Sequence, residues 1–240
     1  MATTPLLNAA VFGASGGIGA ALVARLAARD DVAVVHAGSR QPMAASGKLR
    51  PFRFDLEDEA SIAAAAAGMD SVDLVIIATG VLTLPEGPGP EKAARDLDGA
   101  AMARLFALNT IGPALIARHM LPLLPKSRRA VFAALSARVG SLADNRLGGW
   151  HSYRASKAAL NMLMRNFAIE LARTRPQAMA VALHPGTVQT RLSAPFSRNL
   201  AAGQAVPPDT CAANLLRVID RLTPSDSGCL LAWDGSVIPY

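Results

Sequence analysis

Cysteine and histidine are scarce in this chain of 240 residues, which contains two of the first and four of the second. The cysteines, Cys211 and Cys229, lie close to the C-terminus and fit no metal-ligand spacing, so we expect buried, reduced thiols in a cytosolic protein. No histidine has a second ligand at metal spacing, and the sequence therefore predicts no metal site. At this length, a chain that is 51% hydrophobic needs no disulfide to stabilise its core.

The N-terminus lacks the pattern of a signal peptide. Residues 5–28 are largely apolar, but no basic residue precedes Arg25, and four glycines interrupt the run. No other stretch is long enough to span a bilayer without a charge or a proline. We therefore expect a soluble, cytoplasmic protein that has no membrane partner.

Charged residues are also few, at 18%, and they leave a formal net charge of +6. Such a balance is compatible with nucleic acid, an anionic membrane or a phosphorylated ligand. The arginines are spread along the chain, however, and the densest basic cluster, residues 126–129, has no interleaved aromatic side chain. We expect a solvated loop there and no nucleic-acid partner.

Short apolar runs alternate with longer helical patterns, which is typical of α/β proteins. The predicted strands are 7–12, 32–37, 49–54, 74–78, 130–135, 178–183 and 229–233, and the predicted helices are 18–29, 59–67, a long region ending near 123, 151–173 and 210–222. No repeat or long linker interrupts them. We predict one domain over residues 1–240, a Rossmann-type doubly wound parallel sheet with helices on both faces. Substrate loops are expected at about 82–91, 139–150 and 191–208.

Glycines follow the first predicted strand directly and precede a helix. The loop reads Gly13-Ala-Ser15-Gly-Gly17-Ile18-Gly19, a G-x3-G-x-G spacing rather than the commoner G-x-G-x-x-G. A dinucleotide pyrophosphate needs glycine for close approach and a helix N-terminus for its charge. An ordinary strand–helix turn can also carry a glycine cluster. The flanking strand and helix favour a cofactor loop formed by Gly13, Ser15, Gly17, Ile18 and Gly19.

The end of the second predicted strand indicates which nicotinamide dinucleotide binds. An acidic residue there would bind the ribose 2′-hydroxyl, whereas an arginine accommodates a 2′-phosphate. The sequence has Ser39-Arg40 and no acid at this position. It therefore favours NADP(H) over NAD(H), although Arg40 could also be a surface residue that starts a loop.

Tyr153 and Lys157 are four residues apart in a strongly helical segment, so their side chains project from one face of it. A free phenol has a pKa near 10, and a nearby ammonium lowers that pKa toward the range of an acid–base group. The alternative is a surface pair on an exposed helix. We predict that Tyr153 is the acid–base group and that Lys157 lowers its pKa.

Two further polar residues belong to this hypothesis. Ser136 directly follows the fifth predicted strand, where its hydroxyl could bind a substrate carbonyl, although such a serine is often a turn residue. Asn109 lies in a helical pattern before Gly112-Pro113, which predicts a locally bent helix. Its alternative role is to satisfy backbone groups at that bend.

Taken in order, the glycine loop, Asn109, Ser136, Tyr153-x3-Lys157 and the segment 185–190 resemble the motifs of the short-chain dehydrogenase/reductase family. The resemblance covers nearly the whole chain. It implies that Tyr153 protonates a carbonyl oxygen as hydride arrives from the nicotinamide. It further implies that Lys157 binds the nicotinamide ribose, that Ser136 orients the substrate and that Asn109 supports a proton-relay water.

The same resemblance implies further cofactor contacts. They are Asp55 and Leu56 on the adenine side, Gly80 after the fourth strand, and Pro185, Gly186, Val188 and Thr190 on the nicotinamide side. One motif departs from the family, because Ile77-Ala78-Thr79-Gly80 replaces its usual Asn-Asn-Ala-Gly. Asparagine there normally ties the central sheet together, so we expect that support to come from elsewhere.

Residues 143–161 are similar to the C-factor group of this family, which includes sniffer-type carbonyl reductases. The resemblance implies an NADP(H)-dependent oxidoreductase that reduces a carbonyl or oxidises an alcohol. It also leaves open a C-factor-like signalling or redox-sensing protein whose turnover is incidental. Family membership implies a homodimer or homotetramer, and the sequence does not identify the physiological substrate.

Overall fold

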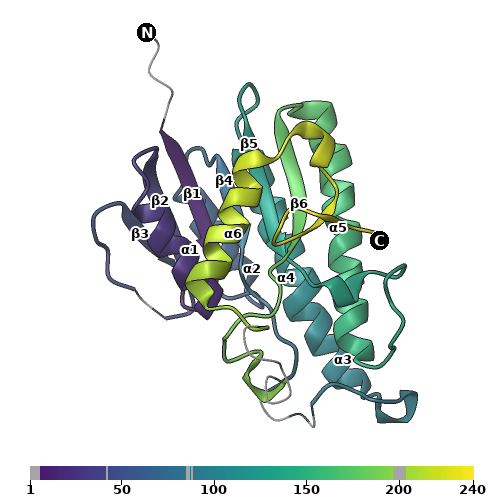
Figure 1. Ribbon diagram of the computed structural model, residues 1–240. Helices are drawn as coiled ribbons and strands as arrows, with labels where there is room; N and C mark the ends of the chain where they lie inside the picture. The colour runs from purple at the N-terminus through teal and green to yellow at the C-terminus, as the bar shows by residue number, and fades with distance from the viewer. Residues whose placement is uncertain (1–5, 42, 85–86, 88, 197–203) are drawn as a thin grey trace.

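The computed structural model describes residues 6–41, 43–84, 87, 89–196 and 204–240. Their strands form one eight-stranded sheet in the order β3-β2-β1-β4-β5-β6-β7-β8 (Figure 1). The strands are β1 (Leu7–Phe12), β2 (Val32–Ser39), β3 (Leu49–Arg53), β4 (Leu74–Ile77), β5 (Ala130–Leu135), β6 (Ala178–His184), β7 (Leu230–Ala232) and β8 (Val237–Ile238). Residues 85–86, 88 and 197–203 of the expected substrate loops lie outside the described residues.

The Rossmann-type fold predicted from the sequence is confirmed, with one correction at the edge of the sheet. Strands β1 to β7 pair in parallel, whereas β8 pairs antiparallel with β7. The strand β8 was missed because two residues are too few to show an alternating pattern. Its buried residue, Ile238, still reaches the core.

Helices cover both faces of the sheet. They are α1 (Gly17–Ala27), α2 (Glu59–Ala67), α3 (Gly99–Phe106), α4 (Gly112–Met120), α5 (His151–Thr174) and α6 (Pro208–Arg221). Helices α1 and α6 pack together on one face, where Leu22 and Leu215 are fully buried. Helices α2, α4 and α5 cover the other face (Figure 1). The doubly wound arrangement follows from right-handed crossovers that place helices on both sides of a parallel sheet.

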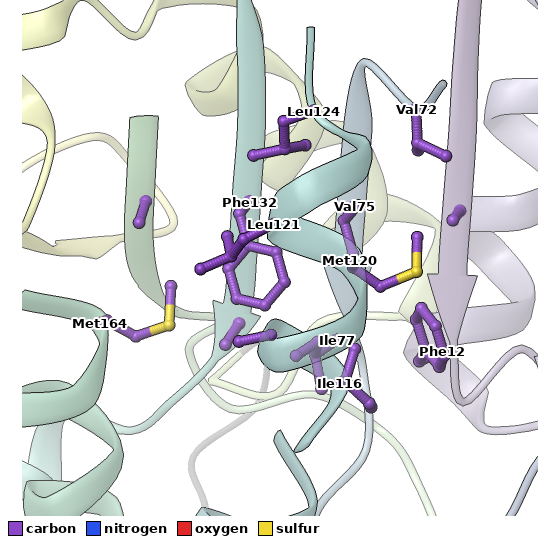
Figure 2. Close-up of a cluster of buried hydrophobic side chains, with 14 of the residues drawn as sticks. Phe12, Val72, Val75, Ile77, Ile116, Met120, Leu121, Leu124, Phe132 and Met164 are labelled. Atoms are coloured by element: carbon purple, nitrogen blue, oxygen red, sulfur yellow. The ribbon is translucent and has the colours of Figure 1, made fainter. Parts of the chain in front are cut away.

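Side chains of the central strands alternate between the two cores. In β4, Val75 and Ile77 point to the α2–α4–α5 side, and Leu74 and Ile76 point to the α1–α6 side. Figure 2 shows Val75 and Ile77 near Ile116 and Met120 of α4. A strand that buries both faces has to be apolar at every position, which is why Leu-Val-Ile-Ile was recognisable as a central strand.

The long helical region before β5 is bent, as its Gly-Pro pair predicted. Helix α3 passes into a π-helical turn, η2 (Ala107–Ile111), and then into α4, which begins with Gly112 and Pro113. A π-turn inserts an extra residue into the helix and is common at functional sites. Asn109 lies inside this turn and is fully buried.

The helical run Gly99–Leu123 is long and apolar enough to cross a membrane by length and composition alone. It contains two prolines, Pro113 and Pro122, and two arginines, Arg104 and Arg118. In this fold the run packs against α2 and α5 rather than standing apart. It therefore serves as part of the helical layer that covers the sheet.

The strand order places a reversal point at the centre of the sheet. From β1 the chain proceeds to β2 and β3 on one side and resumes with β4 on the other side of β1. The loops that follow β1 and β4 therefore diverge at the carboxyl edge, next to the paired residues Phe12 and Ile77. In doubly wound folds, ligands bind in the crevice at this point.

Candidate active site

The glycine loop after β1 lies very close to the neighbouring backbone. The N–H groups of Gly13 and Ala14 both donate to the Gly38 carbonyl oxygen, at 3.0 and 2.8 Å. Gly13 has a φ of +96°, and a Cβ on Gly19 would lie 2.1 Å from the Gly13 carbonyl oxygen. No side chain caps the start of α1 at Gly16. The loop thus leaves room and free N–H groups for a pyrophosphate.

A cavity of about 990 Å³ opens beside this loop, and we call it the glycine-loop cavity. It brings together seven of the predicted cofactor residues: Gly13, Ser15, Ser39, Arg40, Asp55, Leu56 and Gly80. The sequence analysis missed Arg104 of α3 and Glu57, which also line it and form an ion pair at 2.6 Å. Gly17 and Gly19, which were also predicted to bind the cofactor, do not line it.

Ser39 and Arg40 differ in how available they are to a ligand. Ser39 is buried, and its hydroxyl donates to the Gln41 carbonyl oxygen, so that proton is already used. Arg40 is exposed at the end of β2 and lines the glycine-loop cavity. The position that would bind a 2′-phosphate therefore depends on the Arg40 guanidinium more than on the Ser39 proton.

The segment Ala78-Thr79-Gly80 after β4 lines two cavities at once, the glycine-loop cavity and a second one around Tyr153. The Thr79 hydroxyl oxygen is buried and has no hydrogen-bond partner among the described residues. Buried polar atoms are nearly always paired, so this one is suited to a polar ligand group. An extended dinucleotide that reached from one cavity to the other would pass along this segment.

Asn109 holds the loop that follows β4. Its Oδ1 accepts from the Val81 N–H at 2.9 Å, and its Nδ2 donates to the Val81 carbonyl oxygen at 2.8 Å. Nδ2 also donates to the Ser156 hydroxyl at 3.1 Å. Asn109 lines neither cavity, and it joins the loop after β4 to the π-turn and to α5. The backbone groups that it satisfies belong to Val81, in the loop after β4, and not to the helix bend, as its alternative role had predicted.

The Tyr153 cavity has a volume of about 390 Å³. Three of the four predicted catalytic residues line it, and six predicted cofactor residues join them: Ser136, Tyr153, Lys157, Ile18, Gly80, Pro185, Gly186, Val188 and Thr190. Tyr153 and Lys157 come from the first two turns of α5, and Ser136 follows β5. Residues scattered over most of the chain thus meet at the carboxyl edge of the sheet.

The predicted effect of Lys157 on Tyr153 is wrong for this structure. Burial raises the pKa of the Tyr153 phenol to about 12, and burial lowers the pKa of the Lys157 ammonium to about 8. The Lys157 Nζ lies 6.0 Å from the Tyr153 ring centre and donates to the Leu135 carbonyl oxygen at 2.9 Å. Desolvation, which a sequence does not show, is the cause of both shifts.

Ser136 has a buried partner that the sequence analysis did not identify. Its hydroxyl donates to Oδ1 of Asn161 at 2.6 Å, and the Asn161 Nδ2 donates to the Gly140 carbonyl oxygen at 3.3 Å. Asn161 follows Lys157 by four residues, so Tyr153, Lys157 and Asn161 form one row on α5. This four-residue spacing could have identified Asn161 from the sequence as a neighbour of the predicted site.

The remaining wall of the Tyr153 cavity is mostly apolar. Leu82, Val139, Trp150 and Leu192 line it and come from the three expected substrate loops. His184 also lines it, and burial, followed by the charge of Arg138, lowers its pKa to about 4, so it is neutral. Among the described residues, no group of three or more histidine, cysteine, aspartate or glutamate side chains could hold a metal ion.

Known proteins resemble this chain in sequence. The sequence model of the short chain dehydrogenase family matches residues 7–201. The C-signal protein of Myxococcus xanthus is 39% identical over 146 residues, which are 60% of this chain and 82% of that protein. The 1-hydroxy-2-glutathionyl-2-methyl-3-butene dehydrogenase of Rhodococcus sp. (strain AD45) is 32% identical over 235 residues, 96% of this chain and 98% of that protein.

The fold is similar to that of the NADPH-bound carbonyl reductase from chicken fatty liver. The two structures superpose with a TM-score of 0.84 at 28% identity, over 99% of this chain and 100% of the other. The similarity to C-signal confirms the resemblance to the C-factor group. With the family match over residues 7–201, the chain belongs to the short-chain dehydrogenase/reductase family of NAD(P)-dependent oxidoreductases.

Proposed function

We propose that this protein is an NADP(H)-dependent carbonyl reductase, also able to oxidise an alcohol, with Tyr153 as its acid–base group. The observation that carries the proposal is the shared cavity of about 390 Å³ that Tyr153, Ser136 and Lys157 line together. A binding protein that only sensed a dinucleotide would have no need of a proton donor and a hydroxyl in the same cavity. The chain would act as one dinucleotide-binding and catalytic unit over residues 1–240.

The cofactor fits the residues that are present. The pyrophosphate would lie on the glycine loop, whose close packing leaves no room for a side chain: a Cβ on Gly13 would meet the Ala78 backbone at 3.0 Å, and a Cβ on Gly19 would meet the Gly13 carbonyl oxygen at 2.1 Å. Arg40 would bind a 2′-phosphate, which favours NADP(H) over NAD(H). The NADPH bound by the chicken carbonyl reductase is consistent with this preference. When bound, the nicotinamide supplies or accepts the hydride.

Tyr153 is suited to donate a proton in the reductive direction. With a pKa of about 12 it stays protonated at neutral pH. Hydride addition to a carbonyl leaves an oxygen that is far more basic than a phenolate, so the phenol can still transfer its proton. Alcohol oxidation needs the phenolate form of Tyr153, which burial disfavours. Reduction is therefore the direction that this site favours near neutral pH.

Lys157 and Ser136 would assist the reaction by holding the cofactor and the substrate near Tyr153. The Lys157 ammonium has three donors and uses one on the Leu135 carbonyl oxygen, so two remain for the hydroxyls of a nicotinamide ribose. Ser136 would orient the substrate oxygen by a hydrogen bond from its hydroxyl. Asn109 does not line the cavity. Its proposed support of a proton-relay water would therefore act through neighbouring residues and not by direct contact with the substrate.

The substrate is expected to be a small to medium, mostly apolar carbonyl compound. The cavity volume and the side chains of Leu82, Val139 and Trp150 favour it.

Two exposed apolar residues on α5, Met162 and Ile169, support a further proposal, a homodimer or homotetramer joined through the outer helices.

A signalling or redox-sensing role remains the second candidate, because the similarity to C-signal is specific and covers 60% of this chain. The two candidates differ in what Tyr153 does. An enzyme needs its proton, whereas a sensor needs only the bound dinucleotide.

The test is a screen of aldehydes, ketones and alcohols with NADPH consumption or formation as the readout, on the parent chain and on Tyr153→Phe. We expect turnover in the parent chain and a loss of about 100-fold or more in the variant, because general acid catalysis contributes that much. NADPH affinity should be nearly unchanged. Full turnover in Tyr153→Phe would remove Tyr153 from the proposed role, and tight NADPH binding without turnover of any compound would favour the sensor.

A further inference from the structure

We propose that Glu91 is a positioning residue for the active site: it caps the helix that carries Tyr153 and holds Trp150 in place beside it. The inference rests on the proposed function and deepens it. Glu91 lies in the loop between β4 and α3, 61 residues before Ser152, and neither the motifs nor the cavities assign it a role.

Helix α5 has no capping side chain of its own. Its N-cap residue is Trp150, which makes no side-chain cap hydrogen bond, and its first turn contains no acidic residue. The first N–H groups of a helix need acceptors, and the positive end of the dipole favours a carboxylate. Glu91 meets both needs, because its Oε2 accepts from the Ser152 N–H at 3.3 Å and its Oε1 accepts from the Ser152 hydroxyl.

The backbone of Glu91 makes a second contact with the same helix end. Its carbonyl oxygen accepts from the Trp150 N–H at 2.5 Å. Trp150 has a φ of +52°, and among the described residues it is the only non-glycine residue with a positive φ. A residue with a Cβ adopts this conformation only where its surroundings hold it. The two glycines before it, Gly148 and Gly149, also have positive φ and allow the turn.

The turn brings Trp150 against Tyr153. The two rings meet edge to face with their centres 6.4 Å apart, and both line the Tyr153 cavity. Glu91 thus fixes the start of α5 through Ser152 and fixes Trp150 through the backbone. Because Tyr153 is one residue beyond Ser152, a shift at this helix end moves the phenol relative to a bound carbonyl. The contact also joins two of the expected substrate loops, 82–91 and 139–150.

The experiment compares Glu91→Ala and Glu91→Gln with the control Asp96→Ala. Asp96 accepts hydrogen bonds from the N–H groups of Lys92 and Ala93 in the same loop, and among the described residues it forms no hydrogen bond or ion pair with α5. All variants are made in a Trp233→Phe background, in which Trp150 is the only tryptophan of the chain. The readouts are kcat and KM for a carbonyl compound, the Kd of NADPH, and the quenching of Trp150 fluorescence by acrylamide.

For Glu91→Ala we expect kcat to fall about 10-fold or more, because small displacements of a catalytic group are costly. Quenching of Trp150 should increase, while the Kd of NADPH stays within about 2-fold because the glycine loop is untouched. Glu91→Gln should recover much of kcat, since its amide oxygen can still accept from Ser152. Asp96→Ala should change none of these values.

Unchanged kcat and unchanged quenching in Glu91→Ala would overturn the proposal, and so would equal losses in Asp96→Ala. If Glu91→Ala does not fold, Ser152→Ala removes the hydroxyl from the other side of the same contact. It should then reproduce the quenching change, and a parent-like result would count against the proposal. If the parent chain reduces no carbonyl compound, the proposed function fails by itself, and the quenching comparison still tests the cap.

Discussion

The hydroxyl of Ser136 donates its proton to the side-chain oxygen of Asn161, at 2.6 Å inside the protein. The direction of this bond follows from the other end of the amide. The Asn161 Nδ2 faces the Gly140 carbonyl oxygen, which can only accept, so Oδ1 must face Ser136 and accept from it. A substrate carbonyl therefore has to draw the Ser136 proton away from Asn161.

Replacing Asn161 by leucine tests this relationship. The variant leaves the buried Gly140 carbonyl oxygen without a partner, and we expect a loss of about 1–3 kcal/mol in the free energy of unfolding. We also expect kcat/KM for carbonyl reduction to fall about 10-fold, because Ser136 loses the contact that orients it. Urea unfolding and steady-state kinetics measure the two effects. A rise in kcat/KM would show instead that Asn161 competes with the substrate for the proton.

The pH dependence of reduction should come from Lys157 rather than from Tyr153. The pKa of Lys157 is about 8, so its ammonium is present below that pH and is lost as the pH rises through it. Its charge stabilises the phenolate that remains after Tyr153 has given up its proton. We therefore expect kcat/KM to fall above pH 8, while the pKa of Tyr153, about 12, lies beyond the range. A profile that stays flat to about pH 10 would contradict this assignment.

The sequence could predict those parts of the site whose residues lie close together along the chain, and not those whose residues lie far apart along it. The bounds of β1 and β5 were predicted correctly, because each is a mostly apolar run of six residues. Tyr153 and Lys157 were found as a pair because helical spacing is local. The partners of Ser136 and of Ser152 were not found, since they are 25 and 61 residues away and only the packed fold brings them together.

Burial is the second quantity that the sequence did not supply. The spacing of Tyr153 and Lys157 predicted a lowered phenol pKa, and the structure has a raised one because both groups are desolvated. Likewise, Ser39 was expected to be a cofactor-binding residue, and in the structure its hydroxyl donates to the Gln41 carbonyl oxygen. In both cases the environment of the side chain, which the sequence does not show, decides which proton is available.

Arg40→Ala should reduce the preference for NADPH. Removing a cation from the site of a 2′-phosphate is expected to weaken NADPH binding about 10-fold or more and to leave NADH binding nearly unchanged. Arg53→Ala is the matched control, because Arg53 is also exposed, lies on the neighbouring strand β3 and lines neither cavity. Fluorescence titration with both dinucleotides measures the effect. Equal affinities of the parent chain for NADPH and NADH would refute the preference itself.

Gly19→Ala and Gly17→Ala form a matched pair in the glycine loop. A Cβ on Gly19 would lie 2.1 Å from the Gly13 carbonyl oxygen, which is backbone and cannot turn aside, whereas a Cβ on Gly17 would lie 3.0 Å from the Thr190 Cγ2. We expect Gly19→Ala to cost about 1–3 kcal/mol of stability, as overpacking does, and to weaken NADPH binding because the loop is displaced. Gly17→Ala should cost less, since the Thr190 side chain can adjust. Thermal unfolding with and without NADPH measures the stability and the NADPH binding of each variant. Equal stability of the two variants would show that the loop can move to accommodate a side chain at Gly19.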